Sequence, residues 1–149
     1  MGETVRPPAK VLCIPLRDEA DEVASRMLAQ LLVAEGFHVD IEAADALTSE
    51  VVDRVAEFAS DVVVISILPP IAPRDSLLLW KRLRSRFPDL PLVVGFWTSN
   101  TGEALIPAEH DQATKIAVTL AEAVALVRTM AVQRQLSAKP PTSETRTAG

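Results

Sequence analysis

Residues 10–36 read KVLCIPLRDEADEVASRMLAQLLVAEG, and this stretch decides the fold because it contains a buried strand, a tight turn and a long helix. Residues 11–14 form an apolar run without alternation, which is typical of a parallel strand covered on both faces. Pro15 ends the run. From Asp18 onward, apolar residues recur at helical spacing until Gly36, a residue type that commonly stops helices. The stretch therefore predicts the first βα unit of a doubly wound sheet.

Four more apolar runs predict four more strands. Residues 37–41 alternate apolar and polar side chains, which predicts an edge strand with one wet face. The runs at residues 62–65 and 92–94 are dry, as expected of central strands, and residues 116–118 form a short fifth run. Because helical patterns separate the runs, the strands should be parallel, with right-handed crossovers. We therefore predict a three-layered α/β fold with a doubly wound, five-stranded parallel sheet in the order 2-1-3-4-5.

Punctuating residues set the expected bounds of the other helices. Thr48 is a suitable cap for the second helix, and Pro73 suits the first position of a third helix that Pro88 ends. The sequence from Thr119 to Glu122 is a capping box that opens the last helix. The polar text from Thr98 to Thr114 predicts at most a short helix near residues 103–106.

Length and composition indicate one soluble domain. The chain has 149 residues, which suits a single core, and we predict a lead-in at 1–9, a domain at 10–135 and a disordered tail at 136–149. The formal net charge of −5 gives no basic surface for nucleic acid. The single cysteine, Cys13, fits a buried strand residue in a reducing compartment. No run approaches the roughly 18 apolar residues of a membrane span, so we expect a cytoplasmic location.

Asp18 lies in the turn after the first strand, Ser66 and Leu68 follow the third strand, and Gly95 follows the fourth. With this spacing the turns resemble the cobalamin-binding fold, a flavodoxin-like domain. That family has an Asp-x-His-x-x-Gly motif in the first turn, then Ser-x-Leu after the third strand and Gly-Gly after the fourth. In this chain Asp18 matches the first motif, Ser66 and Leu68 match the second, and Gly95 keeps half of the third. The resemblance implies the strand order given above and a ligand cleft at the carboxyl edge of the sheet.

The same motifs depart from the family where cobalamin would bind. Ala20 stands where the resemblance places the cobalt-ligating histidine, and Val23 stands where it places a glycine. The bulky side chains of Val23, Phe96 and Trp97 are expected to fill the space of the buried nucleotide tail. We therefore predict a degenerate cobalamin-binding-like domain without a cofactor.

A second likeness covers about residues 11–130. It rests on the phrases VLCIP at 11–15, RDEADE at 17–22, MLAQLL at 27–32, LPP at 68–70, KRLR at 81–84, RFP at 86–88, VVGFW at 93–97 and TLAEA at 119–123. Together these phrases resemble the soluble region that follows the membrane domain in some proteobacterial permeases of the autoinducer-two exporter family. The resemblance implies a cytosolic accessory domain, expected at the inner face of the membrane next to a membrane domain that this chain lacks.

Other chemistries are disfavoured by the residues present. A phosphate cradle needs glycines at a helix start, yet there is no glycine between Thr4 and Glu35, and the helix opens with four acids. A phosphoryl receiver would need an acidic acceptor after the third strand, where Ser66 stands. His38, His110 and Cys13 have no metal-ligand spacing, and no nucleophile elbow occurs. We predict no enzymatic activity and no metal site.

The acidic first turn has two interpretations. In one, Asp18 caps the helix while Asp21 and Glu22 complement its dipole. In the other, Asp18, Asp21 and Ser66 form a cation or amine site at the sheet edge.

Two functional hypotheses follow. The first is a non-enzymatic regulatory or protein-interaction domain, accessory to a permease, that contacts its partner or anionic lipid through a basic helix and the corner at residues 96–97. The basic residues are Lys81, Arg82, Arg84 and Arg86, for which solubility and a favourable dipole interaction are the alternative role. The second hypothesis is a small-molecule sensor. Its candidate cleft residues are Asp18, Asp21, Ser66, Leu68, Gly95, Trp97 and Asn100.

Overall fold

A central parallel sheet organises the chain. The computed structural model describes residues 7–69, 73–97, 106 and 111–137. The strands are β1 (Lys10–Pro15), β2 (His38–Ile41), β3 (Val62–Ile67), β4 (Leu92–Phe96) and β5 (Thr114–Ala117). They pair in parallel in the order β2-β1-β3-β4-β5, as predicted. The predicted edge strand is β2, whose side chains are exposed or half-buried.

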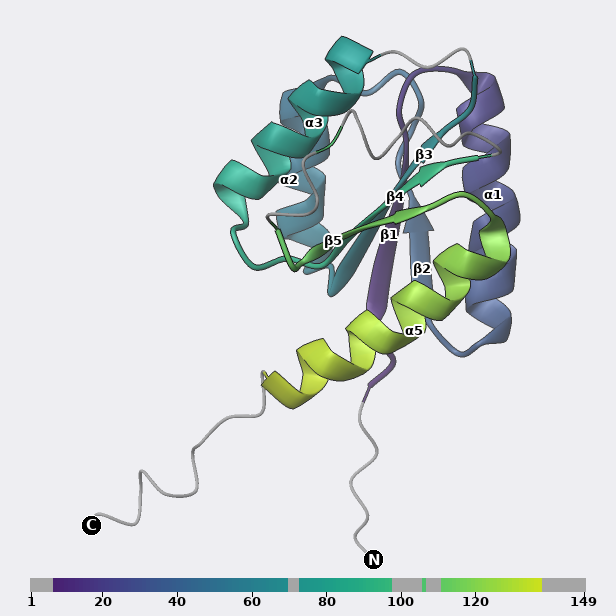
Figure 1. Ribbon diagram of the computed structural model, residues 1–149, viewed down its shortest axis with the longest axis vertical. Coiled ribbons are helices and arrows are strands. Elements are labelled where there is room, and N and C mark those ends of the chain that lie inside the picture. Colours follow the sequence, from purple (N-terminus) through teal and green to yellow (C-terminus); the bar gives the residue numbers. More distant parts are fainter. Residues whose placement is uncertain (1–6, 70–72, 98–105, 107–110, 138–149) are drawn as a thin grey trace, which may run out of the picture.

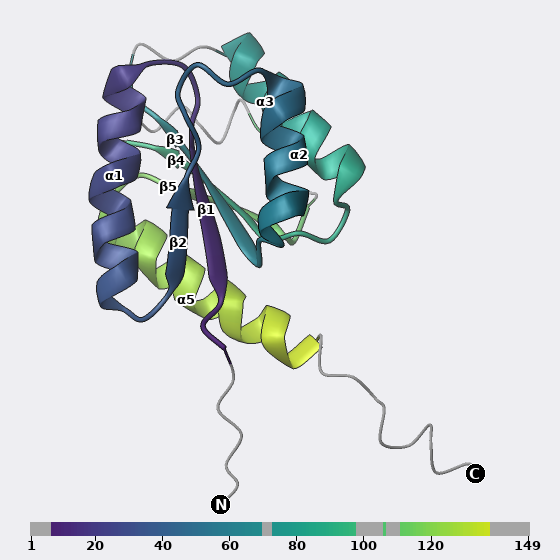
Figure 2. The ribbon, with the colours of Figure 1, turned by 180° about the vertical axis from the view of Figure 1, so that it is seen from behind.

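Helices cover both faces of this sheet. The described helices are α1 (Glu19–Ala34), α2 (Thr48–Phe58), α3 (Pro73–Arg86) and α5 (Leu120–Ser137). Figure 1 shows α2 and α3 on one face of the sheet and α1 and α5 on the other, and Figure 2 shows the same three layers from behind. The doubly wound α/β architecture is therefore confirmed.

Side chains alternate between the two faces of the sheet along each strand, so the hydrophobic core has two halves. Val11, Cys13 and Val64 pack towards α1 and α5, whereas Leu12 and Ile65 pack towards α2 and α3. Because the two halves together bury the strands on both faces, the central strands have no polar alternation. The dry runs in the sequence have this origin.

Element bounds differ from the predictions by a few residues. β4 continues through Phe96, because residues 92–96 are all buried and pair with β3. β5 lies two residues earlier at its start than the predicted strand, and α5 runs to Ser137, beyond the expected end of the domain at residue 135. Leu47 rather than Thr48 is the N-cap of α2, and its backbone N–H donates to Glu50 Oε1 at 2.9 Å.

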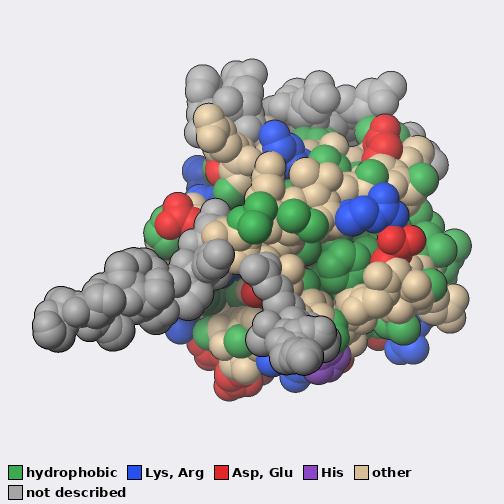
Figure 3. All heavy atoms as spheres, turned by 90° about the horizontal axis from the view of Figure 1, so that it is seen from below, with side chains coloured by type: hydrophobic (Ala, Val, Ile, Leu, Met, Phe, Trp, Pro, Cys, Tyr) green, Lys and Arg blue, Asp and Glu red, His purple; other side chains and the backbone are tan. Residues whose placement is uncertain are grey.

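The expected short helix at residues 103–106 falls outside the described residues except for Ile106, which is buried. Residues 1–6 of the expected lead-in at 1–9, and residues 138–149 of the expected tail at 136–149, also lie outside them. None of the helices that the structure describes combines the length and apolarity needed to cross a membrane. On the face seen from below, where the strands begin, acidic and basic side chains are interspersed with apolar ones (Figure 3).

Candidate functional site

The candidate cleft lies at the carboxyl edge of the sheet, where β1, β3 and β4 end. In open parallel sheets this edge is the usual place for ligands. Three turns meet there, and backbone hydrogen bonds join them: Leu16 N donates to Ser66 O at 3.1 Å, and Trp97 N donates to Ile67 O at 3.1 Å. The predicted cleft residues other than Asn100, which is outside the described residues, are thus brought to one end of the fold.

Asp21 connects two of these turns. Its fully buried carboxylate accepts a hydrogen bond from Arg17 N at 3.0 Å and another from Leu68 N at 2.7 Å. Arg17 also reaches across the turn, because its Nη2 donates to Leu68 O at 3.3 Å. Both carboxylate oxygens of Asp21 therefore hold the backbone of the chain, which is a structural role.

Asp18 caps α1, as the first interpretation of the acidic turn predicts. Its Oδ1 accepts a hydrogen bond from Asp21 N at 3.1 Å, and its backbone is extended. The proposed cation or amine site would need Asp18 and Asp21 to turn the same carboxylates towards a ligand. Since these carboxylates bind backbone N–H groups, the geometry favours the cap. Among the described residues no three His, Cys, Asp or Glu side chains are grouped to hold a metal.

A tryptophan covers the glycine of the third motif. A Cβ placed on Gly95 would overlap the six-membered ring of the Trp97 indole. It would be closest to Cη2 and Cζ2 of that ring and 2.7 Å from Cζ3. Trp97 is buried in the core between the sheet and α1 and α5. Ser66 pairs with Gly95 in the strand register and is also buried, and its hydroxyl has no hydrogen-bond partner within the described part of the chain.

The three bulky residues expected to fill the nucleotide space behave differently. Trp97 does cover Gly95. Phe96 points to the opposite side, into the core under α2 and α3, because neighbouring strand residues face opposite ways. Val23 is 55% exposed. Phe96 and Trp97 are both buried, so the corner at residues 96–97, through which we expected partner contact, exposes neither aromatic side chain.

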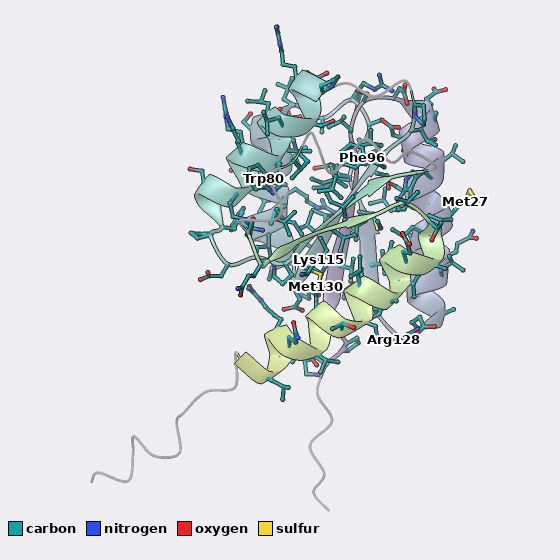
Figure 4. All side chains as sticks on the ribbon, in the orientation of Figure 1. Met27, Trp80, Phe96, Lys115, Arg128 and Met130 are labelled. Atoms are coloured by element: carbon teal, nitrogen blue, oxygen red, sulfur yellow. The ribbon has the colours of Figure 1, made fainter. Side chains whose placement is uncertain are left out.

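Beside Trp97 the surface is hollowed. The hollow has a volume of about 450 Å³ and lies between the first turns of α1, the end of β3 and the start of α5. Its lining is Ala20, Val23, Ala24, Met27, Leu68, Trp97, Val118, Thr119 and Leu120. Leu68 and Trp97 were predicted cleft residues, whereas the walls from α1 and α5 were missed. Figure 4 shows Met27 projecting outward from α1, where it is 52% exposed.

The basic residues of α3 do not form one surface. Lys81 and Arg82 are exposed. Arg86 lies 3.7 Å from Asp53 of α2 at the surface. Arg84 is only 15% exposed and belongs to an internal network, so its assignment to an interaction surface was wrong.

That network was not foreseen from the sequence. Arg84 Nε donates to Asp111 Oδ2 at 2.7 Å, and Arg84 Nη2 and Trp80 Nε1 both donate to Thr114 Oγ1, at 2.8 and 3.0 Å. Arg84 Nη1 also donates to Leu90 O at 2.7 Å. The network ties α3 to the start of β5. The residues that compose it come from separate polar segments, so no local spacing marks them.

Two titratable groups respond to their surroundings. Burial would raise the pKa of Asp111, but hydrogen bonds from Thr114 and Ala113 and the charge of Arg84 outweigh it and hold this pKa below 3.8. Burial raises the pKa of the Cys13 thiol to about 12. Cys13 is therefore a protonated core residue at neutral pH and no nucleophile.

The fold and the site define a flavodoxin-like α/β domain. No family model matches the chain, and no curated protein matches it in sequence. Solved structures do match in fold. A cobalamin-binding protein from Desulfitobacterium hafniense is 16% identical with a TM-score of 0.66, and the match covers 83% of this chain and 59% of that one.

Two more structures place this fold among both kinds of domain considered above. The monomethylamine corrinoid protein of Methanosarcina barkeri is 19% identical (TM-score 0.63; 80% of this chain, 56% of that one). A response regulator receiver domain from Clostridium thermocellum is 16% identical (TM-score 0.60; 86% and 98%). The chain spans under two thirds of the two corrinoid-related structures. At these identities the likeness establishes the fold, and the function must come from the site.

Proposed function

We propose that this chain is a non-enzymatic regulatory domain that senses a small molecule at the carboxyl edge of its sheet. The observation that carries the proposal is the apolar hollow beside Trp97, at the place where this architecture holds its ligands. Cobalamin is an unsuitable ligand, because Ala20 offers no imidazole and the Trp97 indole lies over Gly95. Phosphoryl transfer is disfavoured too, since a serine, Ser66, stands next to the last residue of β3 and its hydroxyl is buried.

A thermal-shift screen tests this proposal. A ligand that binds the folded chain stabilises it by RT ln(1 + [L]/Kd), about 2.7 kcal/mol at one hundred times Kd. We expect a small uncharged metabolite to raise the Tm and hydroxocobalamin to leave it unchanged. Retention of cobalamin on the purified chain, seen in its visible absorption spectrum, would contradict the proposal. The proposal would also be contradicted if no member of a broad metabolite panel raised the Tm.

A second candidate function is the interaction domain, with the permease accessory domain as its specific form. It is supported by Lys81 and Arg82, which are exposed on α3 without an ion pair between them and any described acid. Each such charge near an anionic membrane is worth about 1 kcal/mol. This surface faces away from the hollow, so the two functions are compatible.

Pelleting with phosphatidylserine vesicles tests the second candidate. The variant K81E/R82E should lose binding, while R26E/R128E, with the same change in net charge on exposed residues of α1 and α5, should keep it. Equal recovery of the wild type and K81E/R82E in the supernatant removes membrane contact by α3.

A further inference from the structure

We infer that the ligand of the hollow beside Trp97 is an uncharged apolar molecule, such as a medium-length alkyl chain or a compound of one or two aromatic rings. This inference rests on the proposed sensing function and adds its ligand class. It depends on the size, the polar groups and the charges of the hollow, which are independent of the structural neighbours.

The hollow exists because α1 presents small side chains next to large ones. Ala20 and Ala24 lie one turn apart and leave space, while Val23 and Met27 form a wall beside them. Trp97 and Leu68 contribute from the ends of β4 and β3. At about 450 Å³, the space lies in the range of roughly 300–1,000 Å³ that small-molecule sites occupy. A small molecule can fill a space of this size.

The polar groups at the hollow are already engaged. Two described lining side chains carry a polar atom. Thr119 Oγ1 accepts a hydrogen bond from Glu122 N at 3.1 Å, and the indole Nε1 of Trp97 is buried. Val118 N donates to Glu122 Oε1 at 2.8 Å. A ligand with several hydrogen-bonding groups would lose its hydrogen bonds to water, and the lining would not replace them. Each unpaired group costs about 1–3 kcal/mol of binding free energy. The contact is therefore apolar.

The surrounding charge opposes anions. Glu19 and Glu22 lie in the first turn of α1, and Glu122 lies in the first turn of α5. The positive helix ends that could attract an anion are occupied by the Asp18 cap and the Thr119–Glu122 box. Arg26 lies one turn farther along and pairs with Glu22 at 3.2 Å. Arg17 donates to Leu68 O of the lining, and it lies 3.7 Å from Asp18 and 3.8 Å from Asp21. A carboxylate or sulfonate thus meets several acids, and each of these two arginines already lies beside an acid.

Two fluorescent dyes that differ by one sulfonate test the charge rule. N-phenyl-1-naphthylamine is neutral, and 1-anilinonaphthalene-8-sulfonate has the same rings with a negative charge. We expect the neutral dye to bind at one site per chain and the anionic dye to bind at least about tenfold more weakly, a difference of about 1.4 kcal/mol. Competition should follow the same order, with 1-decanol displacing the neutral dye and decanoate failing to do so.

Matched variants of α1 locate the site. Val23→Asp places a charge in the wall of the hollow and should weaken the neutral dye by about tenfold or more. Val33→Asp is the control, because Val33 is equally exposed (57% against 55%) on the same helix but lies outside the hollow. Ala20→Leu fills the space without adding a charge and should also abolish binding.

The outcomes separate the inference from the proposed function. Stronger binding of the anionic dye, or equal effects of Val23→Asp and Val33→Asp, would overturn the inference about the ligand class. The proposed sensing function would still stand in that case if a metabolite raised the Tm in the thermal-shift screen. Failure of both dyes and of every metabolite would remove both ideas. Sedimentation velocity adds one more check: a wild-type dimer that Val23→Asp dissociates means that a second copy covers this face, which also overturns the inference.

Discussion

At the scale of single residues, Gly95 and Trp97 determine what the carboxyl edge of the sheet can hold. The indole lies against the Cα of Gly95, in a position that a side chain on residue 95 would occupy. The absence of a side chain on Gly95 therefore leaves room for the indole of Trp97, two residues later. The site consists of what this pair leaves open beside α1.

Gly95→Ala should expel the indole. Because the added Cβ would overlap the Trp97 ring, we expect a loss of about 2–3 kcal/mol in the free energy of unfolding, measured with urea. In a Trp80→Phe background, where Trp97 is the remaining tryptophan, its emission should shift to the red. The control is a double-mutant cycle: in Trp97→Ala the same Gly95→Ala change should cost far less. Equal costs in both backgrounds would show that Trp97 does not occupy this space.

At the scale of elements, the helix ends differ in how they are capped. Asp18 caps α1 with its side chain, and Thr119 and Glu122 cap α5 reciprocally. α2 instead ends at Ala59 with φ of +55°, a left-handed conformation in which an alanine is strained. The sequence does not indicate this helix end, because glycine is the usual residue at such a position and an alanine stands here.

Ala59→Gly should stabilise the fold. Relief of the left-handed strain is worth about 1 kcal/mol, and Ala59 is exposed, so few contacts are lost. Ala56→Gly is the matched control: it lies inside α2, is also exposed, and should destabilise by about 1 kcal/mol. Chemical denaturation measures both. Destabilisation by Ala59→Gly would mean that the end of α2 is held by something other than its backbone conformation.

At the scale of the whole molecule, the half-buried Asp111 and the buried Cys13 make the free energy of unfolding depend on pH at opposite ends of the pH range. Burial would raise the pKa of Asp111, but Thr114, Ala113 and Arg84 lower it from 3.8. Asp111 therefore stabilises the folded chain above pH 3.8, and this stabilisation is lost as the pH falls through the pKa that Asp111 has in the folded state. The pKa of Cys13 is raised by burial from 9.0 to about 12, so its contribution is present below pH 9 and is lost towards pH 12.

The pH profile of unfolding should therefore decline on both sides, and each side should respond to one variant. Asp111→Asn should flatten the acid decline, and Cys13→Ala should flatten the alkaline decline, where the chain has no tyrosine to contribute. Differences between variant and wild type, taken from denaturation midpoints at each pH, isolate the two groups. An alkaline decline that is unchanged in Cys13→Ala would show that the thiol is accessible in the folded chain.

Much of this architecture could be predicted from the sequence. Continuous apolar runs such as residues 11–14 and 62–65 marked central strands, since burial on both faces removes alternation. The Asp18 cap and the Thr119–Glu122 box marked helix starts, because these signals act over three or four residues. The order of strands followed from the wet second strand and from the handedness of crossovers. Local patterns marked the strands and these helix starts, and the rule on crossover handedness then gave the strand order.

The candidate site required the tertiary structure. Leu68 and Trp97 could be named as cleft residues, but their joint wall with Val23 and Met27 depends on how α1 lies against the ends of β3 and β4. The role of Arg84 also depended on a partner, Asp111, that is 27 residues away. A charged helix residue looks the same in sequence whether it faces solvent or a buried acid. Sequence by itself determined the layers, the strand order and the starts of α1 and α5, because short-range periodicity, capping and the handedness of crossovers control them. Tertiary structure alone decided which side chains share a hollow and which charges are internal, because contacts between distant segments control those.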